Sequence, residues 1–454
     1  MSTATELAAA LRAREVSARE VMESHLARIA EVNPRVNAIV TLLEPELALK
    51  AADEADRRPP RGVLHGLPIA VKDLEETAGM RTTFGSPLFA DNVPQHDSLL
   101  VERLRNAGAI VIGKTNTPEF GAGSQTFNAV FGATRNPYDL TKTPGGSSGG
   151  AAAAVAAGMI PFADGSDLGA SVRNPAAFCN LVGLRPSPGR IPEAGPGDPW
   201  NPFPVFGPIA RTPRDAALLL EALAGPDARD PLSIQEPFAA GDLDSDPRGL
   251  KVAWSRDLGG LPVDPRVTAV LETARATLEE LGCVVDDAEP DFSDADECFE
   301  VMRGVTFAGA FAGIVDQVKP ALAENTRFGL ELTAPRIARA LALRGELFTR
   351  MREFLTRYDF LAAPVTQVPP FSVEDEYPRE IDGTPMGTYI EWFRSCSRIT
   401  VTSHPAIAVP AGFTDDGLPV GLQLVGRHRD ERSLLGLAHA ITEATGLAQR
   451  TPPL

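Results

Sequence analysis

Two glycine-rich segments hold the residues whose types and spacing best suit chemistry. The first is GGSSGG at 145–150 and the second is GSDLGAS at 165–171. Successive backbone N–H groups in a tight glycine-containing bend can converge on one oxygen and form an anion-binding nest. A serine in such a nest, here Ser171, can attack a carbonyl carbon while the same N–H groups stabilise the resulting oxyanion. The pattern therefore indicates nucleophilic attack on a carbonyl compound.

Lysine is scarce in this chain, which makes Lys72 conspicuous. Six lysines stand against 37 arginines, and Lys72 ends the apolar segment LPIAVKD at 67–73. A serine hydroxyl is a weak nucleophile until a base removes its proton. A buried lysine can be that base because burial disfavours the ammonium form. Taken alone, Lys72 has a second interpretation, an ion pair with Asp73 or another acid.

The first glycine-rich segment, 145–150, which we call the first turn (and 165–171 the second turn), also fits the G-x-S-x-G pattern of an α/β-hydrolase nucleophile elbow, with Ser147 as nucleophile. That elbow requires an apolar strand directly before it, and YDLTKTP at 138–144 is poor strand material. A downstream histidine would complete the triad of this alternative, namely His404, His428 or His439. The turn is not a phosphate-binding P-loop, because no Gly-Lys-Ser/Thr follows it.

Composition excludes several classes of protein. The chain has 454 residues and a formal charge of −17, which disfavours binding to nucleic acid or anionic membranes, both polyanions. No apolar run reaches the roughly 18 residues of a membrane span, and the first residues lack the order of a signal peptide. The four dispersed cysteines form no CxxC, and the six histidines form no HxH or HxxxH. We expect a cytoplasmic protein with reduced thiols and no metal site.

Helices and strands alternate along the chain, which predicts an α/β sheet. In the first half, the pattern predicts a helical part over 1–60 with a capping box at Ser17 and Glu20, then strands and helices at 67–73, 96–108 (starting at Asp97), 109–114, 151–158 and 211–225. In the second half, it predicts a surface connection at 226–249, a β-α-β unit at 250–255, 264–282 and 283–287, a mostly helical region at 295–360, a long loop at 365–388, a hairpin of 405–413 with 418–426, and a last helix at 431–446.

Several motifs together resemble the amidase-signature family. They are LPIAVKD, IVIGKTNTPEFG, GGSSGGAAAAVAAG, GSDLGASVRNPAAFCNLVGLRPSPGR, GPIARTPRDAALLL and PAIAVPAGFTDDGLPVGLQLVG. The resemblance covers nearly the whole chain and is most specific over 67–225. It implies a single large α/β domain, 1–454, with a mixed many-stranded sheet wrapped by helices. Within it we expect an N-terminal helical part (1–60), a catalytic core (61–225) and a helical and loop part (295–400) that shapes the substrate pocket.

The resemblance also implies a Ser-Ser-Lys triad. Lys72 is then the base, Ser147 the bridging serine after a cis peptide bond, and Ser171 the nucleophile. The implied oxyanion hole consists of the backbone N–H groups of Leu168, Gly169, Ala170 and Ser171. Two of these depart from the family pattern, since Leu168 replaces a threonine and Ala170 a glycine. The backbone N–H donors survive both replacements, so we expect the replacements to alter the pocket floor and substrate preference instead. We expect Ala170 at negative φ, with its methyl group facing the cavity.

Other residues receive supporting or neutral roles. We expect Asp167 and Arg173 to pair and hold the nucleophile turn, and Ser148 to support the bridging serine. We expect Glu75 and Glu76 to belong to a solvated face. The aromatic residues that hint at an apolar substrate end are Phe127, Phe131, Trp200, Phe203, Phe206 and Trp392, of which Phe127, Phe131, Trp200 and Trp392 are the predicted substrate contacts.

The predicted function is that of an amidohydrolase acting on C–N bonds of small amides, anilides or carbamates (urethanes), with esterase side activity. It proceeds through an acyl-enzyme on Ser171 and requires no cofactor. We expect small-molecule substrates, no nucleic acid or membrane partner, and a monomer or homodimer. The alternatives are a glutaminyl-tRNA amidotransferase subunit, whose partner would bind the tRNA, a hydrolase using Ser147 and a histidine, and a non-catalytic binding protein.

Overall fold

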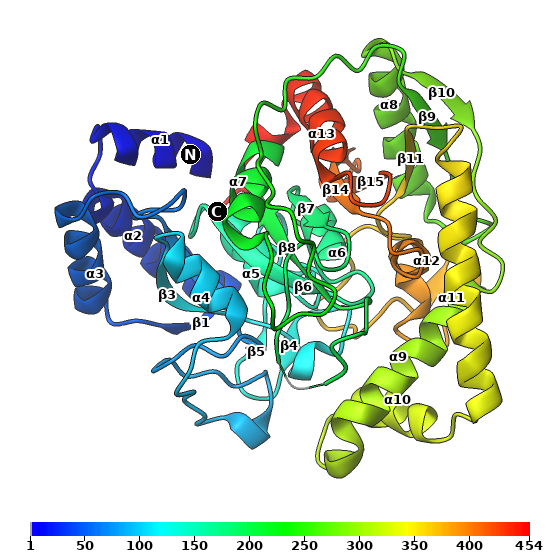
Figure 1. Ribbon diagram of the computed structural model, residues 1–454, viewed down its shortest axis with the longest axis horizontal. Coiled ribbons are helices and arrows are strands. Elements are labelled where there is room, and N and C mark those ends of the chain that lie inside the picture. Colours follow the sequence, from blue (N-terminus) through cyan, green and yellow to red (C-terminus); the bar gives the residue numbers. More distant parts are fainter. Residues whose placement is uncertain (1, 196) are drawn as a thin grey trace.

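An eight-stranded mixed sheet runs through the molecule, and a three-stranded sheet lies beside its β6 edge (Figure 1). This computed structural model describes residues 2–195 and 197–454. In spatial order the large sheet consists of β10 (Val284–Asp287), β9 (Lys251–Trp254), β11 (Phe360–Pro364), β15 (Pro419–Val425), β14 (Ala406–Phe413), β7 (Val182–Arg185), β8 (Val205–Ala210) and β6 (Phe162–Asp167). The small sheet consists of β1 (Ile39–Leu42), β3 (Ile110–Thr115) and β2 (Pro68–Lys72). Two short hairpins are β4 (Phe127–Asn128) with β5 (Gly132–Ala133), and β12 (Glu380–Ile381) with β13 (Thr384–Pro385).

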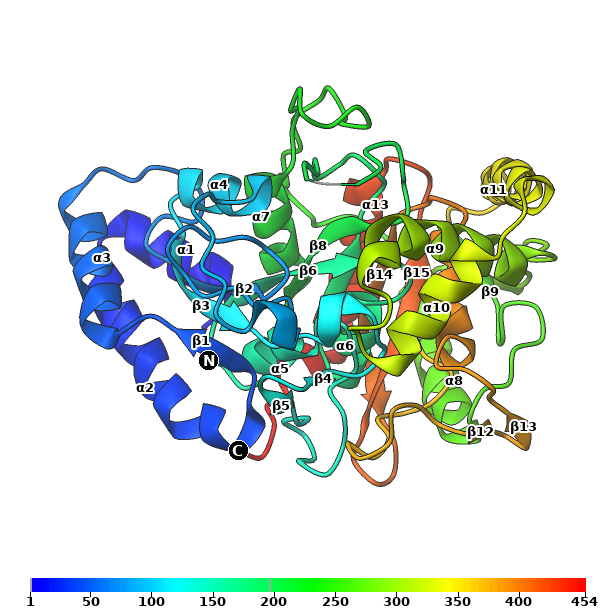
Figure 2. The same cartoon turned by 90° about the horizontal axis from the view of Figure 1, so that it is seen from below.

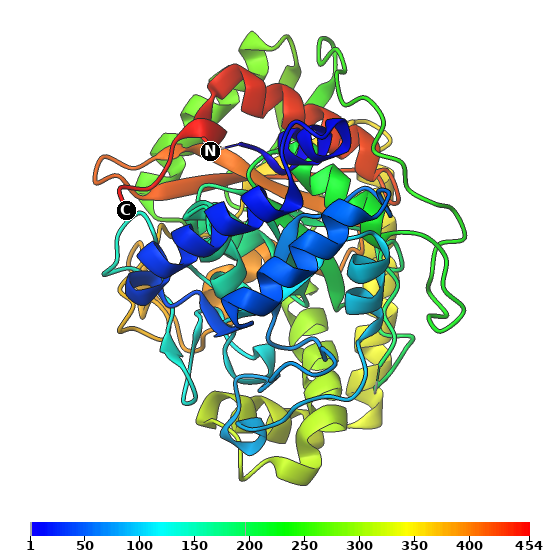
Figure 3. The same cartoon turned by 90° about the vertical axis from the view of Figure 1, so that its left-hand side faces the viewer.

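Helices cover both sheets. Those of the first half are α1 (Ala4–Ala13), α2 (Ala18–Val36), α3 (Pro45–Arg57), α4 (Leu99–Asn106), α5 (Gly149–Ala156), α6 (Arg173–Phe178) and α7 (Pro213–Leu223). Those of the second half are α8 (Pro265–Glu280), α9 (Ala295–Phe311), α10 (Pro320–Leu330), α11 (Ala334–Phe354), α12 (Arg394–Thr400) and α13 (Glu431–Thr445). Figure 3 shows α1–α3, in blue, on the side of the small sheet, whereas Figure 2 shows α9–α11 at the opposite end of the molecule.

The small-residue helix α5 lies between the two sheets, where it contacts β6 and β8 of the large sheet and β1, β2 and β3 of the small one. All eight of its residues are buried. Neighbouring backbone approaches it closely: a Cβ on Gly150 would lie 2.3 Å from the backbone nitrogen of Asn116. Glycine and alanine therefore permit both sheets to pack on one helix, and this packing brings the first turn against β2.

Most elements expected from the sequence are confirmed, including the single-domain mixed α/β fold. The β-α-β unit forms β9, α8 and β10 with parallel pairing, and the last hairpin pairs as β14 and β15. Three expectations need correction. The N-terminal part contains a strand, β1. Helix α4 is capped by Ser98, because Asp97 accepts a hydrogen bond from Ala78 instead. The segment 162–167 is a strand, so the second turn begins only after Asp167.

Among residues 2–195 and 197–454, none of the helices combines the length and apolar character needed to cross a membrane. The same residues contain no group of three or more His, Cys, Asp or Glu side chains placed to hold a metal ion.

Candidate active site

Lys72 ends the buried strand β2, and its ammonium lies among three serine hydroxyls. All five residues of β2 are buried, and the strand pairs in parallel with β3. Lys72 Nζ donates hydrogen bonds to Ser147 Oγ at 2.8 Å, Ser148 Oγ at 2.9 Å and Ser166 Oγ at 3.0 Å. The side chain is 0% exposed. The base and the bridging serine implied by the family resemblance are thus in direct contact.

The first turn positions Ser147 and Ser148 at the start of α5. The peptide bond between Gly146 and Ser147 is cis, as the resemblance implies. Ser148 is the N-cap of α5. The backbone of Gly149, the first residue of α5, packs closely on the side chain of Thr126, since a Cβ on Gly149 would lie 2.3 Å from Thr126 Oγ1. Ser148, expected in a supporting role, accepts a hydrogen bond from the ammonium of the lysine through its hydroxyl.

Ser166 is a site residue that sequence analysis missed. It lies in β6, where side chains two residues apart share a face. Asp164 and Ser166 both reach Lys72, one its backbone and the other its side chain. The period-two spacing in FADGSD was the available signal, but the glycines of 165–171 indicated a turn there instead.

The second turn connects β6 to α6 and presents Ser171 to a cavity that Ser147 also lines. Ser171 is half-buried, and no described residue hydrogen-bonds its hydroxyl. The backbone N–H groups of Gly169, Ala170 and Ser171 likewise have no acceptor among the described residues. Ala170 lies outside the left-handed region, as expected, and it is one of the residues that line the cavity. The turn therefore combines a free hydroxyl with free backbone donors.

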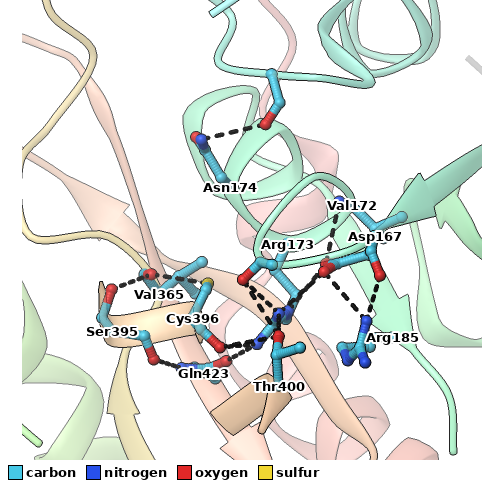
Figure 4. A network of polar contacts seen from close by, with 12 residues as sticks. Asp167, Val172, Arg173, Asn174, Arg185, Val365, Ser395, Cys396, Thr400 and Gln423 are labelled. Carbon is cyan, nitrogen blue, oxygen red and sulfur yellow. Dashed lines mark hydrogen bonds and ion pairs between the residues drawn. The ribbon is translucent and has the colours of Figure 1, made fainter. Parts of the chain in front are cut away.

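A buried charge network holds this turn (Figure 4). Arg173 donates to both oxygens of Asp167 at 3.0 Å, so the expected ion pair is present. Arg173 also donates to the carbonyl of Gly169 at 2.9 Å. Arg185 forms a second ion pair with Asp167 at 3.3 Å, and Asp167 accepts from the backbone of Val172 at 3.2 Å. Both sides of the turn are thereby fixed to one carboxylate.

The same arginine anchors the turn to the C-terminal part of the sheet. Arg173 Nη1 donates to Gln423 Oε1 on β15 at 2.8 Å and to the carbonyl of Cys396 on α12 at 3.0 Å. Arg173 Nη2 donates to Thr400 Oγ1 at 2.8 Å. Figure 4 shows these groups converging on the guanidinium from the side opposite Asp167. Charge-assisted bonds of this kind are strong when buried, and they join residues 167–173 to residues 396–423.

Burial shifts Lys72 toward its neutral form. Burial lowers the pKa of Lys72 to about 8, against the opposing charges of Asp164, Glu75 and Asp167. Burial also raises the pKa of Asp164 to about 6. Asp167 behaves oppositely: burial opposes its charge, but Arg173 and Arg185 prevail and lower its pKa to about 2. The base is therefore tuned toward deprotonation, while the scaffold carboxylate stays ionised.

The cavity has a volume of about 370 Å³ and is rich in aromatic side chains. Its floor is the second turn with Leu168, Gly169, Ala170 and Ser171. The aromatic lining consists of Phe84, Phe120, Phe206, Phe299, Phe307, Phe311, Tyr389 and Phe393. The charged lining residues are Glu75, Glu193 and Arg303. This composition suits a ligand that is largely apolar and carries a few polar groups.

The four aromatic residues predicted as substrate contacts do not line this cavity, and that assignment needs correction. Trp200 is 65% exposed, and Phe131 lies beneath the guanidinium of Arg81. Phe127 packs against Lys319. Trp392 is fully buried behind the lining and donates to Ser124 Oγ at 2.7 Å. Of the wider aromatic group, only Phe206 reaches the cavity among the described residues. The actual aromatic lining comes mainly from α9 and 389–393, whose position depends on tertiary packing.

Glu75 also corrects a prediction, because it is buried and lines the cavity. Its carboxylate accepts a hydrogen bond from Ser98 Oγ at 3.0 Å. Burial, together with the charge of Asp164, raises the pKa of Glu75 to about 7. Glu76 is exposed, as expected. The chain turns directly after Lys72, where the backbone N–H of Glu75 donates to the carbonyl of Lys72 at 3.0 Å, and this turn leaves Glu75 buried and Glu76 exposed.

The nucleophile-elbow alternative is inconsistent with the structure. No strand of the described chain leads directly into 145–149, and none of the three histidines lines the cavity. His404 Nδ1 lies 2.8 Å from the carbonyl of Thr402. His428 lies against Ser403 and His439 against Asp244. Ser147 instead has Lys72 as its partner.

Comparison with known proteins agrees with this geometry. The family model described as Amidase matches residues 20–435. The chain belongs to the amidase-signature family. It is 38% identical to an acylamidase of Rhodococcus erythropolis over 99% of this chain and 97% of the relative. It is 36% identical to a subunit of the glutamyl-tRNA(Gln) amidotransferase of Geobacillus kaustophilus over 99% and 98%.

A solved structure of a bacterial aryl acylamidase of the amidase-signature family superimposes with a TM-score of 0.92 at 28% identity. The match covers 99% of this chain and 98% of that one. As an amidase-signature enzyme the chain is a hydrolase that acts on amides. The family and fold inferred from the sequence motifs are therefore confirmed, and the residues described above are the amidase's candidate machinery.

Proposed function

We propose that this amidase cleaves aryl amides, anilides and aryl carbamates through an acyl-enzyme on Ser171. The observation that carries the proposal is the 2.8 Å contact between Lys72 Nζ and Ser147 Oγ at the edge of an aromatic cavity that also contains Ser171. The similarity to an acylamidase and an aryl acylamidase supports the acyl and aryl parts of this assignment.

In the proposed acylation step, Ser171 Oγ attacks the carbonyl carbon. Its proton passes to Ser147 Oγ while the Ser147 proton passes to neutral Lys72 Nζ. A tetrahedral oxyanion forms, and the free N–H groups of Gly169 and Ala170 are placed to bind it. The C–N bond then breaks, and the proton on Lys72 returns through Ser147 to the leaving nitrogen. The step conserves protons and needs no external acid.

In the proposed deacylation step, water replaces the departed amine. Lys72 accepts the water proton through Ser147, hydroxide adds to the acyl carbon, and Ser171 regains its proton as the acid leaves. A carbamate follows the same course after its C–N bond breaks, and the released carbonate monoester decomposes to an alcohol and carbon dioxide. Esters fit the same steps with an alcohol as leaving group, which accounts for the expected esterase side activity.

A panel of substrates and a serine probe test the proposal. We expect hydrolysis of acetanilide-type and carbamate substrates, labelling of Ser171 by a fluorophosphonate, and loss of both in Ser171→Ala. Ser397→Ala, a buried serine outside the cavity lining, should retain them. Labelling of Ser147 with Ser171 unmodified would contradict the assignment of the nucleophile.

A second candidate function follows from the 36% identity to an amidotransferase component. That function would transfer ammonia from an amide inside a complex, and it would use the same Lys72, Ser147 and Ser171. Release of ammonia from glutamine, with anilides left uncleaved, would favour it. Cleavage of anilides by the isolated chain would favour the free enzyme. Cytoplasmic location and a monomeric or homodimeric state stay predictions.

A further inference from the structure

Arg303 is a buried guanidinium on the cavity wall with no acidic partner among the described residues. It is 4% exposed and lines the cavity. Its acceptors in the described chain are neutral, since Nη1 donates to Asn325 Oδ1 and Nη2 to Tyr389 Oη. The guanidinium carbon lies 3.9 Å from the ring centre of Phe307. No described aspartate or glutamate forms an ion pair with it, whereas Arg394 nearby pairs with Glu300 at 3.2 Å.

This arrangement leaves a buried charge incompletely compensated. A charge removed from water is costly unless it is paired and hydrogen-bonded. The aromatic face of Phe307 offsets part of that cost, and the two neutral acceptors occupy only two of five N–H donors. Burial lowers the pKa of Arg303, but a guanidinium stays charged in proteins. The remaining donors are available to a ligand in the cavity.

Helix α9 places Arg303 close to the second turn. Phe299, Arg303 and Phe307 are spaced four residues apart, and all three line the cavity. Phe299 packs on the turn, because a Cβ on Gly169 would lie 2.6 Å from its ring. At about 1.5 Å of rise per residue, Arg303 is about 6 Å further along the helix. A ligand group at Arg303 would therefore be a few bonds from a carbonyl at the turn.

A second cation, Lys319, lies within electrostatic range of Arg303, and the carboxylates of Glu376 and Glu119 offset part of its charge. Lys319 Nζ is buried and has no hydrogen-bond partner among the described residues. It would lie 3.2 Å from a Cβ on Gly123, a lining residue. Glu75 and Glu193 also line the cavity. Burial raises the pKa of Glu193 to about 8, so near neutral pH it is Glu75 that repels an anion from its own position. The favourable position for a negative group is accordingly at Arg303.

We propose that Arg303 forms a carboxylate-binding subsite, so that preferred substrates are amides bearing a carboxylate a few bonds from the scissile carbonyl. The planar fork of a guanidinium matches the two oxygens of a carboxylate. The inference rests on the proposed function for the reaction itself, and adds the chemical class of the substrate's distal group.

Paired anilides test the subsite. Each pair has the same acyl chain, with two to five methylenes, ending either in a carboxylate or in a neutral isopropyl group of similar shape. We expect kcat/KM for aniline release to favour the acid by at least tenfold at the best chain length, mainly through KM. Arg303→Gln should lower that acid-to-neutral ratio at least tenfold, and Arg303→Lys should retain part of it. Arg336→Gln, which alters an exposed arginine stacked on Phe328 at 5.2 Å, should leave the ratio unchanged.

Two results would overturn the subsite. One is a wild-type ratio at or below one at every chain length. The other is an equal loss on both substrates in Arg303→Gln and Arg303→Lys, which indicates a packing role. Calorimetric binding of the same pairs to Ser171→Ala makes the comparison without turnover. If no anilide is cleaved, the proposed function fails, while tighter binding of the acid still supports the subsite and equal binding still refutes it.

Discussion

Asp164 hydrogen-bonds to the backbone of Lys72 and not to its side chain. Its two carboxylate oxygens each lie 3.2 Å from the Lys72 backbone nitrogen. The ammonium donates to serine hydroxyls instead, and no carboxylate of the described residues forms an ion pair with it. Asp73, which the sequence offered as a partner, accepts hydrogen bonds from Thr83. The ion-pair interpretation of Lys72 is therefore wrong.

This arrangement supplies acceptors to the lysine without fixing its charge. An opposite charge in direct contact would favour the ammonium form, whereas burial disfavours it. Burial outweighs the charges of Asp164, Glu75 and Asp167, and the pKa of Lys72 falls to about 8. A base that is partly neutral near neutral pH suits general-base work.

The first prediction concerns the pH dependence of the wild-type enzyme. We expect kcat/KM for an anilide to rise with pH through an apparent pKa near 8, the value to which burial lowers Lys72, and then to level. This rising limb of the pH profile is expected because the neutral amine of Lys72 is the active form. The apparent value belongs to the coupled set of Lys72, Glu75 and Asp164 rather than to one residue.

Substitution of Lys72 tests the same assignment. Lys72→Ala should lower kcat/KM for amides by about 10²–10⁴-fold, as expected for a lost general base. Activated esters should lose less, because their leaving group needs no returned proton. Lys72→Arg should not restore activity, since a guanidinium does not deprotonate. Near-normal anilide hydrolysis by Lys72→Arg would reduce Lys72 to an electrostatic or structural partner.

The second prediction concerns Glu75, whose negative charge opposes deprotonation of Lys72. Glu75 has a pKa of about 7, so it is mostly ionised where Lys72 titrates. Glu75→Gln removes that charge, and the rising limb of kcat/KM should move to lower pH. Glu76→Gln, an exposed neighbour, is the matched control and should leave the limb in place. A limb that stays fixed in Glu75→Gln would show that the two groups are not coupled.

Local sequence patterns predicted the parts of the site that depend on neighbouring residues. The run PIAVK is apolar and short, so its strand and the position of Lys72 at its end followed directly. The two glycine-rich segments were recognisable because neighbouring atoms lie too close to their glycines for most side chains. The pairing of Asp167 with Arg173 also followed, since both flank one turn.

The cavity wall was not predictable in the same way. Phe299, Arg303 and Phe307 lie on α9, more than a hundred residues after the turn they face. An amphipathic helix indicates which face is apolar, but it does not say which surface that face contacts. Trp392 illustrates the difference: one residue away from the lining Phe393, it points into the core and bonds to Ser124.

The third prediction concerns the stability of the second turn. Asp167→Asn removes the carboxylate that pairs with Arg173 and Arg185, leaving two buried guanidinium groups uncompensated. We expect a loss of about 3–5 kcal/mol in the free energy of unfolding, as for other broken buried ion pairs, measured by chemical denaturation. Asp246→Asn, which breaks an exposed pair with Arg248, should leave the denaturation midpoint unchanged.

The acid sensitivity of this network has a defined sign. Arg173 and Arg185 lower the pKa of Asp167 to about 2, below the ordinary aspartate value of about 3.9. Its stabilisation is therefore present above pH 4 and is lost as the pH falls toward 2. Between these values, the wild-type protein should lose more stability than Asp167→Asn. Parallel curves of unfolding free energy against pH for the two proteins would contradict this assignment.

The fourth prediction concerns Ala170, which lies outside the left-handed region and is one of the residues that line the cavity. Ala170→Gly removes the methyl group of Ala170. Substrates whose acyl groups are too wide for the present cavity floor should therefore gain kcat/KM. We expect the ratio of kcat/KM for benzanilide over acetanilide to rise about tenfold, the lower end of what one methylene contributes in a pocket. The unfolding free energy should fall by only about 0.5–1 kcal/mol, the usual cost of glycine flexibility. Ala176→Gly, a buried alanine of α6 outside the cavity lining, should affect stability without changing the ratio. An unchanged ratio together with a stability loss several times larger would mean that the methyl group serves packing and that this departure from the family pattern does not set substrate preference.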